Sequence, residues 1–310
     1  MTTPDTTTQP EFLANNLDAG RLIDEKDFIS HIDAAVSMQQ LIVGMDREIF
    51  SKRGLDKFAE TDSSDLTKTV CWPTTVLTAI RHLGGNHALS LADFYELGIN
   101  THINDRTDAN GETEKGFPSF HRNSLDTYLR FALEFAKIEG LSGGLFTQFK
   151  DLQFSRDALK HSVILLSVDN LFIPEVMNTQ LRKTTYQPSR HAELIHGQKG
   201  NSLIVTDVEN THDGLSWDSR NKQIPAEVVK NYITSPRLND SFTRAVVLTG
   251  NQIDWDNAVE ALNICGDIEN ERPNPILKPF FGKGIETALN ETRKTVGQGL
   301  SQWEMIPQTT

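Results

Sequence analysis

Cysteine is scarce in this chain, which has two among its 310 residues, Cys71 and Cys265. Two cysteines cannot form a disulfide framework, and they lack the spacing of metal-ligating cysteines. The chain is long enough to bury a full hydrophobic core without such cross-links. We therefore expect a protein that folds in a reducing compartment without a disulfide or metal cross-link. The sequence also implies no metal or organic cofactor.

Long hydrophobic runs and basic patches are also missing. No segment approaches the ~18 apolar residues of a membrane-spanning helix, and residues 1–11 have neither the basic nor the apolar stretch of a secretory signal. With 42 acidic and 30 basic residues the formal net charge is -12, so no nucleic-acid partner is expected. The expected location is the cytoplasm, and export without a cleaved signal stays open.

Apolar periodicity predicts an α+β fold in which helices come first and an antiparallel sheet follows. Helical spacing is found at 27–50, 71–83, 89–97, 124–138, 225–233, 255–265 and 284–302, and strand-like apolar runs at 163–168, 192–196, 203–206 and 245–248. We divide the chain into a flexible N-terminal segment (1–26), a catalytic domain (27–250) and a C-terminal helical extension (251–310). The polar stretch 100–119 is a candidate lid, on length alone.

Cys71 lies where the sequence predicts the start of a helix. Pro73 suits the first turn of a helix, and Gly84 suits its end. The free N–H groups and the positive end of the helix dipole favour a thiolate over a thiol at this position. Cys71 is therefore a candidate nucleophile, although a buried cysteine is also a common packing residue.

A cysteine nucleophile needs a base and a third group that fixes the imidazole. His191 begins one predicted strand, and Asp207 ends the next, sixteen residues later. If the two strands pair through the turn at 198–201, the start of the first lies beside the end of the second. We therefore expect His191 and Asp207 to be neighbours.

Other residues compete for these roles. His196 lies on the same strand, but alternation points it to the face opposite His191. Asn210 is a rival for the orienting role of Asp207. Trp72 is expected to pack beside the nucleophile and to shield it from water, and Cys265 is expected to be buried.

Several of these stretches resemble the papain-like cysteine peptidases, most closely the bacteriocin-processing, double-glycine-type branch. They are Cys71-Trp72-Pro73-Thr74 at a helix start, the strand at 163–168, and the segments 190–197 and 204–207. The resemblance spans about residues 60–250 and implies a papain-like fold, with N-terminal helices packed on the antiparallel sheet. It also implies roles: Cys71 attacks a carbonyl, His191 is the base, and Asp207 orients His191.

One position departs from that family. The family has a glutamine six residues before the nucleophile, which donates a hydrogen bond in the oxyanion hole, whereas this chain has Asp65. An ionised carboxylate cannot donate and opposes a developing oxyanion. Thr67, Thr69 or Ser64 can replace the missing donor, beside the backbone N–H of Cys71.

The predicted function is a cysteine hydrolase that cleaves a peptide or amide bond of a peptide or protein substrate through an acyl-enzyme intermediate. Two alternatives stay open. Phytochelatin synthase, an acyl transferase, is similar to this chain in the order of its cysteine, histidine and aspartate and in the spacing of the last two. A catalytically degenerate protease fold kept for protein interaction is the other, with Asp65 as its main support.

Overall fold

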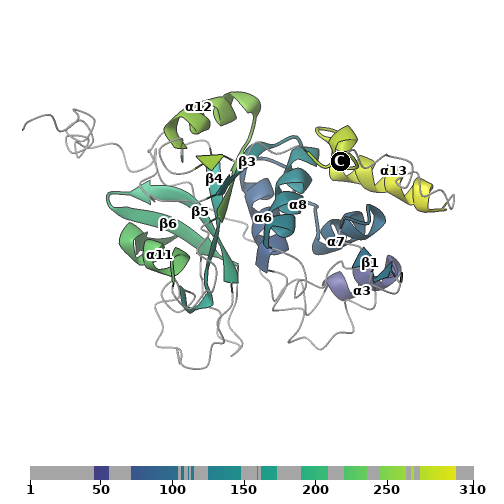
Figure 1. Cartoon of the computed structure of the whole chain (residues 1–310), viewed down its shortest axis with the longest axis horizontal. Coiled ribbons are helices and arrows are strands. Elements are labelled where there is room, and N and C mark those ends of the chain that lie inside the picture. The colour runs from purple at the N-terminus through teal and green to yellow at the C-terminus, as the bar shows by residue number, and fades with distance from the viewer. Residues whose placement is uncertain are drawn as a thin grey trace, which may run out of the picture.

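The computed structural model describes residues 45–55, 71–103, 106–107, 111, 113–114, 125–147, 159, 162–172, 190–208, 220–235, 244–262, 267–268 and 273–297. These residues form one main antiparallel sheet with helices on both of its faces (Figure 1). The prediction of an α+β chain with an antiparallel sheet is thus confirmed. Among the described helices, none has the length and apolar character to cross a membrane.

The main sheet has seven strands in the described part of the chain, in the order β7-β6-β5-β4-β8-β3-β9. All neighbouring strands are antiparallel. The strands are β3 (Ser142–Thr147), β4 (Ser162–Asp169), β5 (Arg190–Lys199), β6 (Ser202–Asp207), β7 (Lys222–Pro225), β8 (Arg244–Thr249) and β9 (Asp267–Ile268). The four predicted strands correspond to β4, β5, β6 and β8, whereas β3, β7 and β9 were not predicted.

Helix α6 (Cys71–His82) is the central helix of the fold, and every residue from Cys71 to Ile80 is buried. Gly84 follows the helix with φ 86°, the left-handed conformation that glycine adopts easily. The hydroxyl of Thr75 donates to the carbonyl of Cys71 over 2.7 Å, so this polar side chain is satisfied inside the core. Burial on all sides fixes the position of α6, and with it the position of Cys71.

Three more helices share a core with α6 on one face of the sheet: α7 (Leu91–Asn100), α8 (Leu125–Ile138) and α13 (Ile285–Gly297) (Figure 1). Leu77, Phe94, Leu133, Leu165 and Leu289 belong to this core. Ser90 caps α7 through a capping box with Asp93. The helix at the C-terminal end of the described chain therefore packs into the same core as the helix that carries Cys71.

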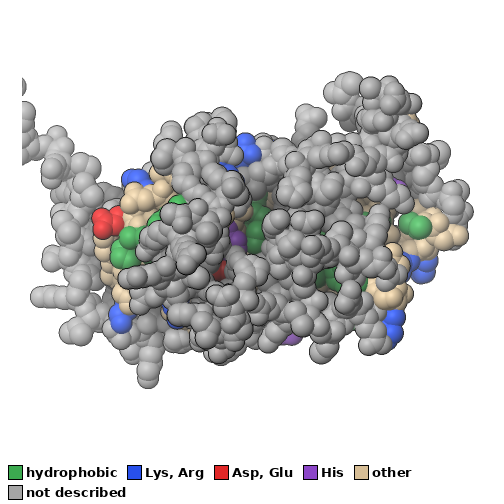
Figure 2. Space-filling view, turned by 90° about the horizontal axis from the view of Figure 1, so that it is seen from below, with side chains coloured by type: hydrophobic (Ala, Val, Ile, Leu, Met, Phe, Trp, Pro, Cys, Tyr) green, Lys and Arg blue, Asp and Glu red, His purple; other side chains and the backbone are tan. Residues whose placement is uncertain are grey.

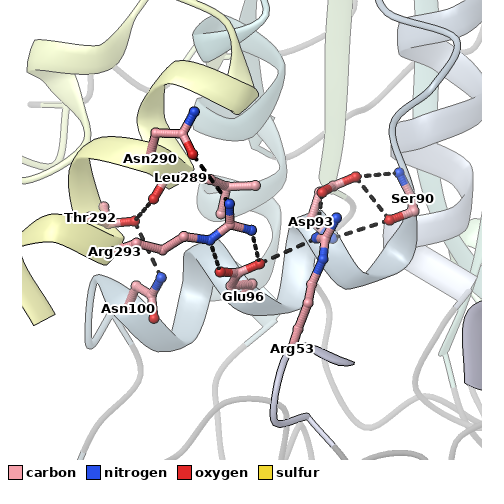
Figure 3. A network of polar contacts seen from close by, with 9 residues as sticks. All are labelled: Arg53, Ser90, Asp93, Glu96, Asn100, Leu289, Asn290, Thr292 and Arg293. Atoms are coloured by element: carbon pink, nitrogen blue, oxygen red, sulfur yellow. Dashed lines mark hydrogen bonds and ion pairs between the residues drawn. The ribbon is translucent and has the colours of Figure 1, made fainter. Parts of the chain in front are cut away.

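A polar network ties α7 to its two neighbours, α13 and α3 (Met45–Lys52) (Figure 3). Glu96 of α7 accepts two hydrogen bonds from Arg293 of α13, one of them Nη2 to Oε2 over 2.7 Å. Arg53, just after α3, pairs with Asp93 and approaches Glu96 Oε2 to 3.3 Å. Two carboxylates and two guanidinium groups thus alternate across three helices.

The opposite face of the sheet carries α11 (Ala226–Ile233) and α12 (Gln252–Leu262) (Figure 1). Val229 and Ala258 of these helices pack with Ile164 and Val247 of the sheet. The sequence predicted both helices but not the face they cover. The central strands of the sheet are therefore buried on both sides, which accounts for the continuous, mostly apolar sequence of β4.

The predicted lid at 100–119 is described only in part. It contains a short ladder, β1 (Arg106–Thr107) paired with β2 (Thr113–Glu114). The predicted N-terminal segment at 1–26 lies outside the described residues.

Candidate active site

Cys71 is the first residue of α6, at the position that the sequence predicted. Its side chain is buried and makes a hydrogen bond with the side chain of His191 on β5. Helix α6 packs against β5, and its last residue, His82, lies beside His196. The start of the helix therefore lies toward the strand end that bears His191. The structure thus brings the predicted nucleophile and the predicted base into contact.

Asp207, at the end of β6, is the second partner of His191. Its Oδ1 lies 3.1 Å from His191 Nε2, and both side chains are buried. Because Asp207 engages Nε2, the other ring nitrogen, Nδ1, is left for the Cys71 sulfur. The predicted proximity of His191 and Asp207 is confirmed.

A β-bulge at His196 is what places Asp207 on the face of His191. From Lys199↔Ser202 the pairing of β5 and β6 runs regularly to Gly197↔Ile204, and it then shifts by one residue at Ile195. An uninterrupted ladder would pair Asp207 with Leu194, whose side chain points to the opposite face from His191. The extra residue makes Glu193 the partner of Asp207 instead, and Glu193 shares the face of His191.

The environment of His191 favours its protonated form. Burial alone would lower the pKa of His191, because a buried imidazolium loses its hydration. The charge and hydrogen bond of Asp207 act in the opposite direction, as do the hydrogen bond and the charge of Cys71. Together they raise the pKa of His191 well above its usual 6.5. The site therefore supplies the imidazolium that stabilises a cysteine thiolate.

Glu193 is a site residue that the sequence did not single out. It is fully buried, and its Oε1 lies 3.7 Å from His191 Nε2. In the sequence it appears as one polar residue inside a strand, which has no distinctive signal. Only Gly197, a residue typical of bulges within strands, marked the irregularity that sets its register.

Comparisons with models of known protein families, with curated proteins and with solved structures give no match. Figure 2 shows histidine and acidic side-chain atoms next to hydrophobic ones near the middle of one face of the molecule. In the candidate site, the residue His191 is 4% exposed, so bulk water has little access to its ring.

The second histidine of β5 has a different environment. His196 Nε2 lies 3.0 Å from Thr206 Oγ1, and its ring centroid is 5.7 Å from that of His82, at the far end of α6. His191 and His196 thus contact opposite ends of the same helix. The prediction that the strand directs only one of them at Cys71 agrees with this arrangement.

Trp72 is buried beside Cys71, as expected. The remaining candidates lie outside the described residues: Ser64, Asp65, Thr67, Thr69, Asn210 and Cys265. The side-chain donors proposed for an oxyanion hole therefore stay predictions. Among the described residues, one group of side chains has the geometry to hold a metal ion, namely His191, Glu193 and Asp207.

Proposed function

We propose that the protein is a cysteine-dependent hydrolase of papain-like fold, which cleaves a peptide or amide bond through an acyl-enzyme intermediate. One observation carries the proposal: Cys71, at the N-terminus of a buried helix, contacts His191, and Asp207 holds the opposite side of the imidazole ring. A nucleophile, a base and an orienting group in this order are the parts that covalent acyl transfer requires.

The side chains of the site can carry out each proton transfer that this chemistry requires. The Cys71 proton passes to His191, and the resulting thiolate attacks the carbonyl carbon of the substrate. His191 then gives a proton to the departing amine, which leaves an acyl-enzyme thioester on Cys71. In the second half His191 takes a proton from water, the hydroxide attacks the thioester, and the thiolate leaves. Asp207 stabilises the imidazolium that forms twice in this cycle.

The environment of the three side chains supports the same proposal. Each is less than a tenth exposed, so the charges of thiolate and imidazolium attract one another with little screening by water. Asp207 also fixes the ring by accepting a hydrogen bond from Nε2, which leaves Nδ1 for the sulfur. Neither feature is needed by a cysteine that only packs in a core.

Alkylation by iodoacetamide tests the proposal without knowledge of the substrate. An isolated thiol with a pKa near 8.5 is less than about 1% thiolate at ~pH 6. Cys71 paired with imidazolium should react at this pH at least ~10²-fold faster than Cys71 in His191→Ala. Mass spectrometry of the modified peptides measures the rate at each cysteine separately.

His196→Ala is the matched control, because His196 is a buried histidine of the same strand that contacts the other end of α6. It should leave the alkylation rate of Cys71 unchanged, and circular dichroism should show that both variants are folded. Equal labelling of Cys71 in wild type and in His191→Ala would refute the thiolate–imidazolium pair. A screen of peptide mixtures, with Cys71→Ala as the inactive reference, then defines the bond that is cleaved.

A further inference from the structure

Three ligand-type side chains converge at the base of the candidate active site. His191, Glu193 and Asp207 each offer one nitrogen or oxygen atom, and these atoms all lie within 4.8 Å of one another. All three residues are buried, with exposed fractions of 4%, 0% and 1%. Exposed carboxylates often gather without binding anything, but burial of a histidine between two carboxylates is costly unless their charges are balanced.

The strand register explains why these groups meet. Glu193 and Asp207 are direct cross-strand partners, and His191 precedes Glu193 by two positions, on the same face. Like charges directly opposite one another on neighbouring strands repel. A cation between the two carboxylates removes that repulsion, and the imidazolium of His191 supplies one positive charge. A divalent ion supplies two positive charges, which balance the two negative charges of the carboxylates when the imidazole is neutral.

The two distances from His191 Nε2 to the carboxylates are close to those of a zinc site. A tetrahedral Zn²⁺ site with bonds of ~2.0–2.1 Å has ligand atoms about 3.3–3.4 Å apart. His191 Nε2 lies 3.1 Å from Asp207 Oδ1 and 3.7 Å from Glu193 Oε1. Small side-chain rotations would bring both distances to this value. One imidazole nitrogen and two carboxylate oxygens are also ligand types that Zn²⁺ accepts.

We propose that His191 Nε2, Glu193 and Asp207 form a binding site for a divalent transition metal ion, best suited to Zn²⁺, and that the bound metal blocks the chemistry of His191. The metal takes the place of the Nε2 proton, which is released to solvent. Cys71 is not counted as a ligand, because its sulfur is not in the group of atoms that lie within 4.8 Å of one another. The binding itself is independent of the proposed function, whereas the block rests on it.

Metal binding would block catalysis because His191 could no longer become doubly protonated. With Nε2 bound to the metal, the ring carries at most one proton, on Nδ1, so imidazolium cannot form. The step in which His191 donates a proton to the departing amine then has no acid, because a neutral imidazole holds its last proton too strongly. Turnover should therefore fall in proportion to metal occupancy.

Isothermal titration calorimetry of the metal-free, full-length protein with zinc chloride at neutral pH tests the site. We expect one strong site in the wild type, and a dissociation constant raised about tenfold or more in Glu193→Gln. Gln has nearly the same shape as Glu, and circular dichroism verifies that the variant is folded. Wild-type affinity in Glu193→Gln, or the absence of a strong site in the wild type, would overturn the proposal.

Two further variants separate this site from other ways of binding zinc. His196→Gln removes a buried histidine outside the cluster and should keep the wild-type affinity. Cys71→Ala should keep it as well, because the thiol is not a ligand. Loss of binding in Cys71→Ala would overturn the three-ligand site in favour of a thiolate–imidazole site, and loss in His196→Gln would place the metal elsewhere.

The outcomes for metal and for catalysis are distinguishable. If zinc binds as expected but Cys71 shows no reactivity that depends on His191, the metal site stands and the hydrolase proposal falls. If Cys71 shows reactivity that depends on His191 and no zinc binds, the hydrolase proposal stands and the metal site falls. If both hold, the zinc concentration that halves peptide cleavage should equal the calorimetric dissociation constant and should rise about tenfold in parallel with it in Glu193→Gln.

Discussion

Two pairs of neighbouring carboxylates in this chain have their charge balanced in different ways. Asp93 and Glu96 of α7 are paired with Arg53 and Arg293, two cations that keep their charge at every ordinary pH (Figure 3). The other pair, Glu193 and Asp207, lies beside His191, a cation that can lose its charge. The first pair connects helices, whereas the charge of the second depends on a proton or a metal.

The positions of the two groups agree with this division. The arginine network lies between α3, α7 and α13 at the rim of the helical layer, where Arg293 is 44% exposed at its side chain. The histidine group lies at the junction of α6, β5 and β6. In the arginine network, fixed charges hold helices together and do not change protonation state. In the histidine group, a titratable side chain within the core can take part in proton transfer.

Asp207→Asn should have the largest effect on stability. Removal of one partner of a buried ion pair costs about 3 kcal/mol, and the cost should depend on pH. Because the pKa of folded His191 is raised above 6.5, the stabilisation by the pair is fully present below ~pH 6.5 and disappears as pH rises through the raised value. Urea denaturation at pH values below and above this range measures the difference between variant and wild type.

A loss that is equal at all pH values in Asp207→Asn would contradict the titrating pair. Asp169→Asn is a useful second reference, because Asp169 is also fully buried on this sheet, where it accepts a hydrogen bond from Ser235 over 2.6 Å. Its cost should not follow the titration of His191.

Glu96→Gln should have a smaller effect, about 1.5 kcal/mol, because the carboxylate is buried but its arginine partners are partly exposed to water. This loss should be the same at about pH 6 and pH 9, since neither arginine titrates in this range. High salt should reduce it, because screening weakens partly exposed pairs. A clear dependence on pH in Glu96→Gln would remove the distinction between the two groups.

Glu193→Gln should have the smallest effect in the metal-free protein, below about 1 kcal/mol. The change removes a charge that repels the directly opposite Asp207, and it keeps the shape of the side chain. Thermal denaturation in the presence of a chelator measures this effect. A loss as large as that of Asp207→Asn would indicate that Glu193, and not Asp207, is the principal partner of His191.

The sequence predicted the helices and strands with strong periodicity, but it did not predict β3. This strand contains Gly143, and glycine disfavours strands. In the fold a Cβ at Gly143 would lie 2.3 Å from the carbonyl oxygen of Val247 and 3.2 Å from Leu133 Cδ1. Glycine is thus required by the close approach of β8 and α8, which is a tertiary constraint that local patterns do not contain.

The three predicted catalytic residues are brought together, whereas a further group, Glu193, was found only in the structure. His191 and Asp207 were predictable because the two ends of a hairpin meet. The prediction did not consider the face on which Asp207 lies, and that face depends on the bulge at His196. The oxyanion donors stay predictions, since residues 56–70 are outside the described part.

The bulge also determines which insertions or deletions in the β5–β6 hairpin would keep Asp207 on the face of His191. Its turn consists of Gly200 and Asn201, and the pairing begins at Lys199↔Ser202. An insertion of one residue before Asp207 would reverse the face on which Asp207 lies relative to His191, and an insertion of two would restore it. Homologous chains that keep this site should therefore differ by even numbers of residues between the histidine and the aspartate, unless a bulge is gained or lost.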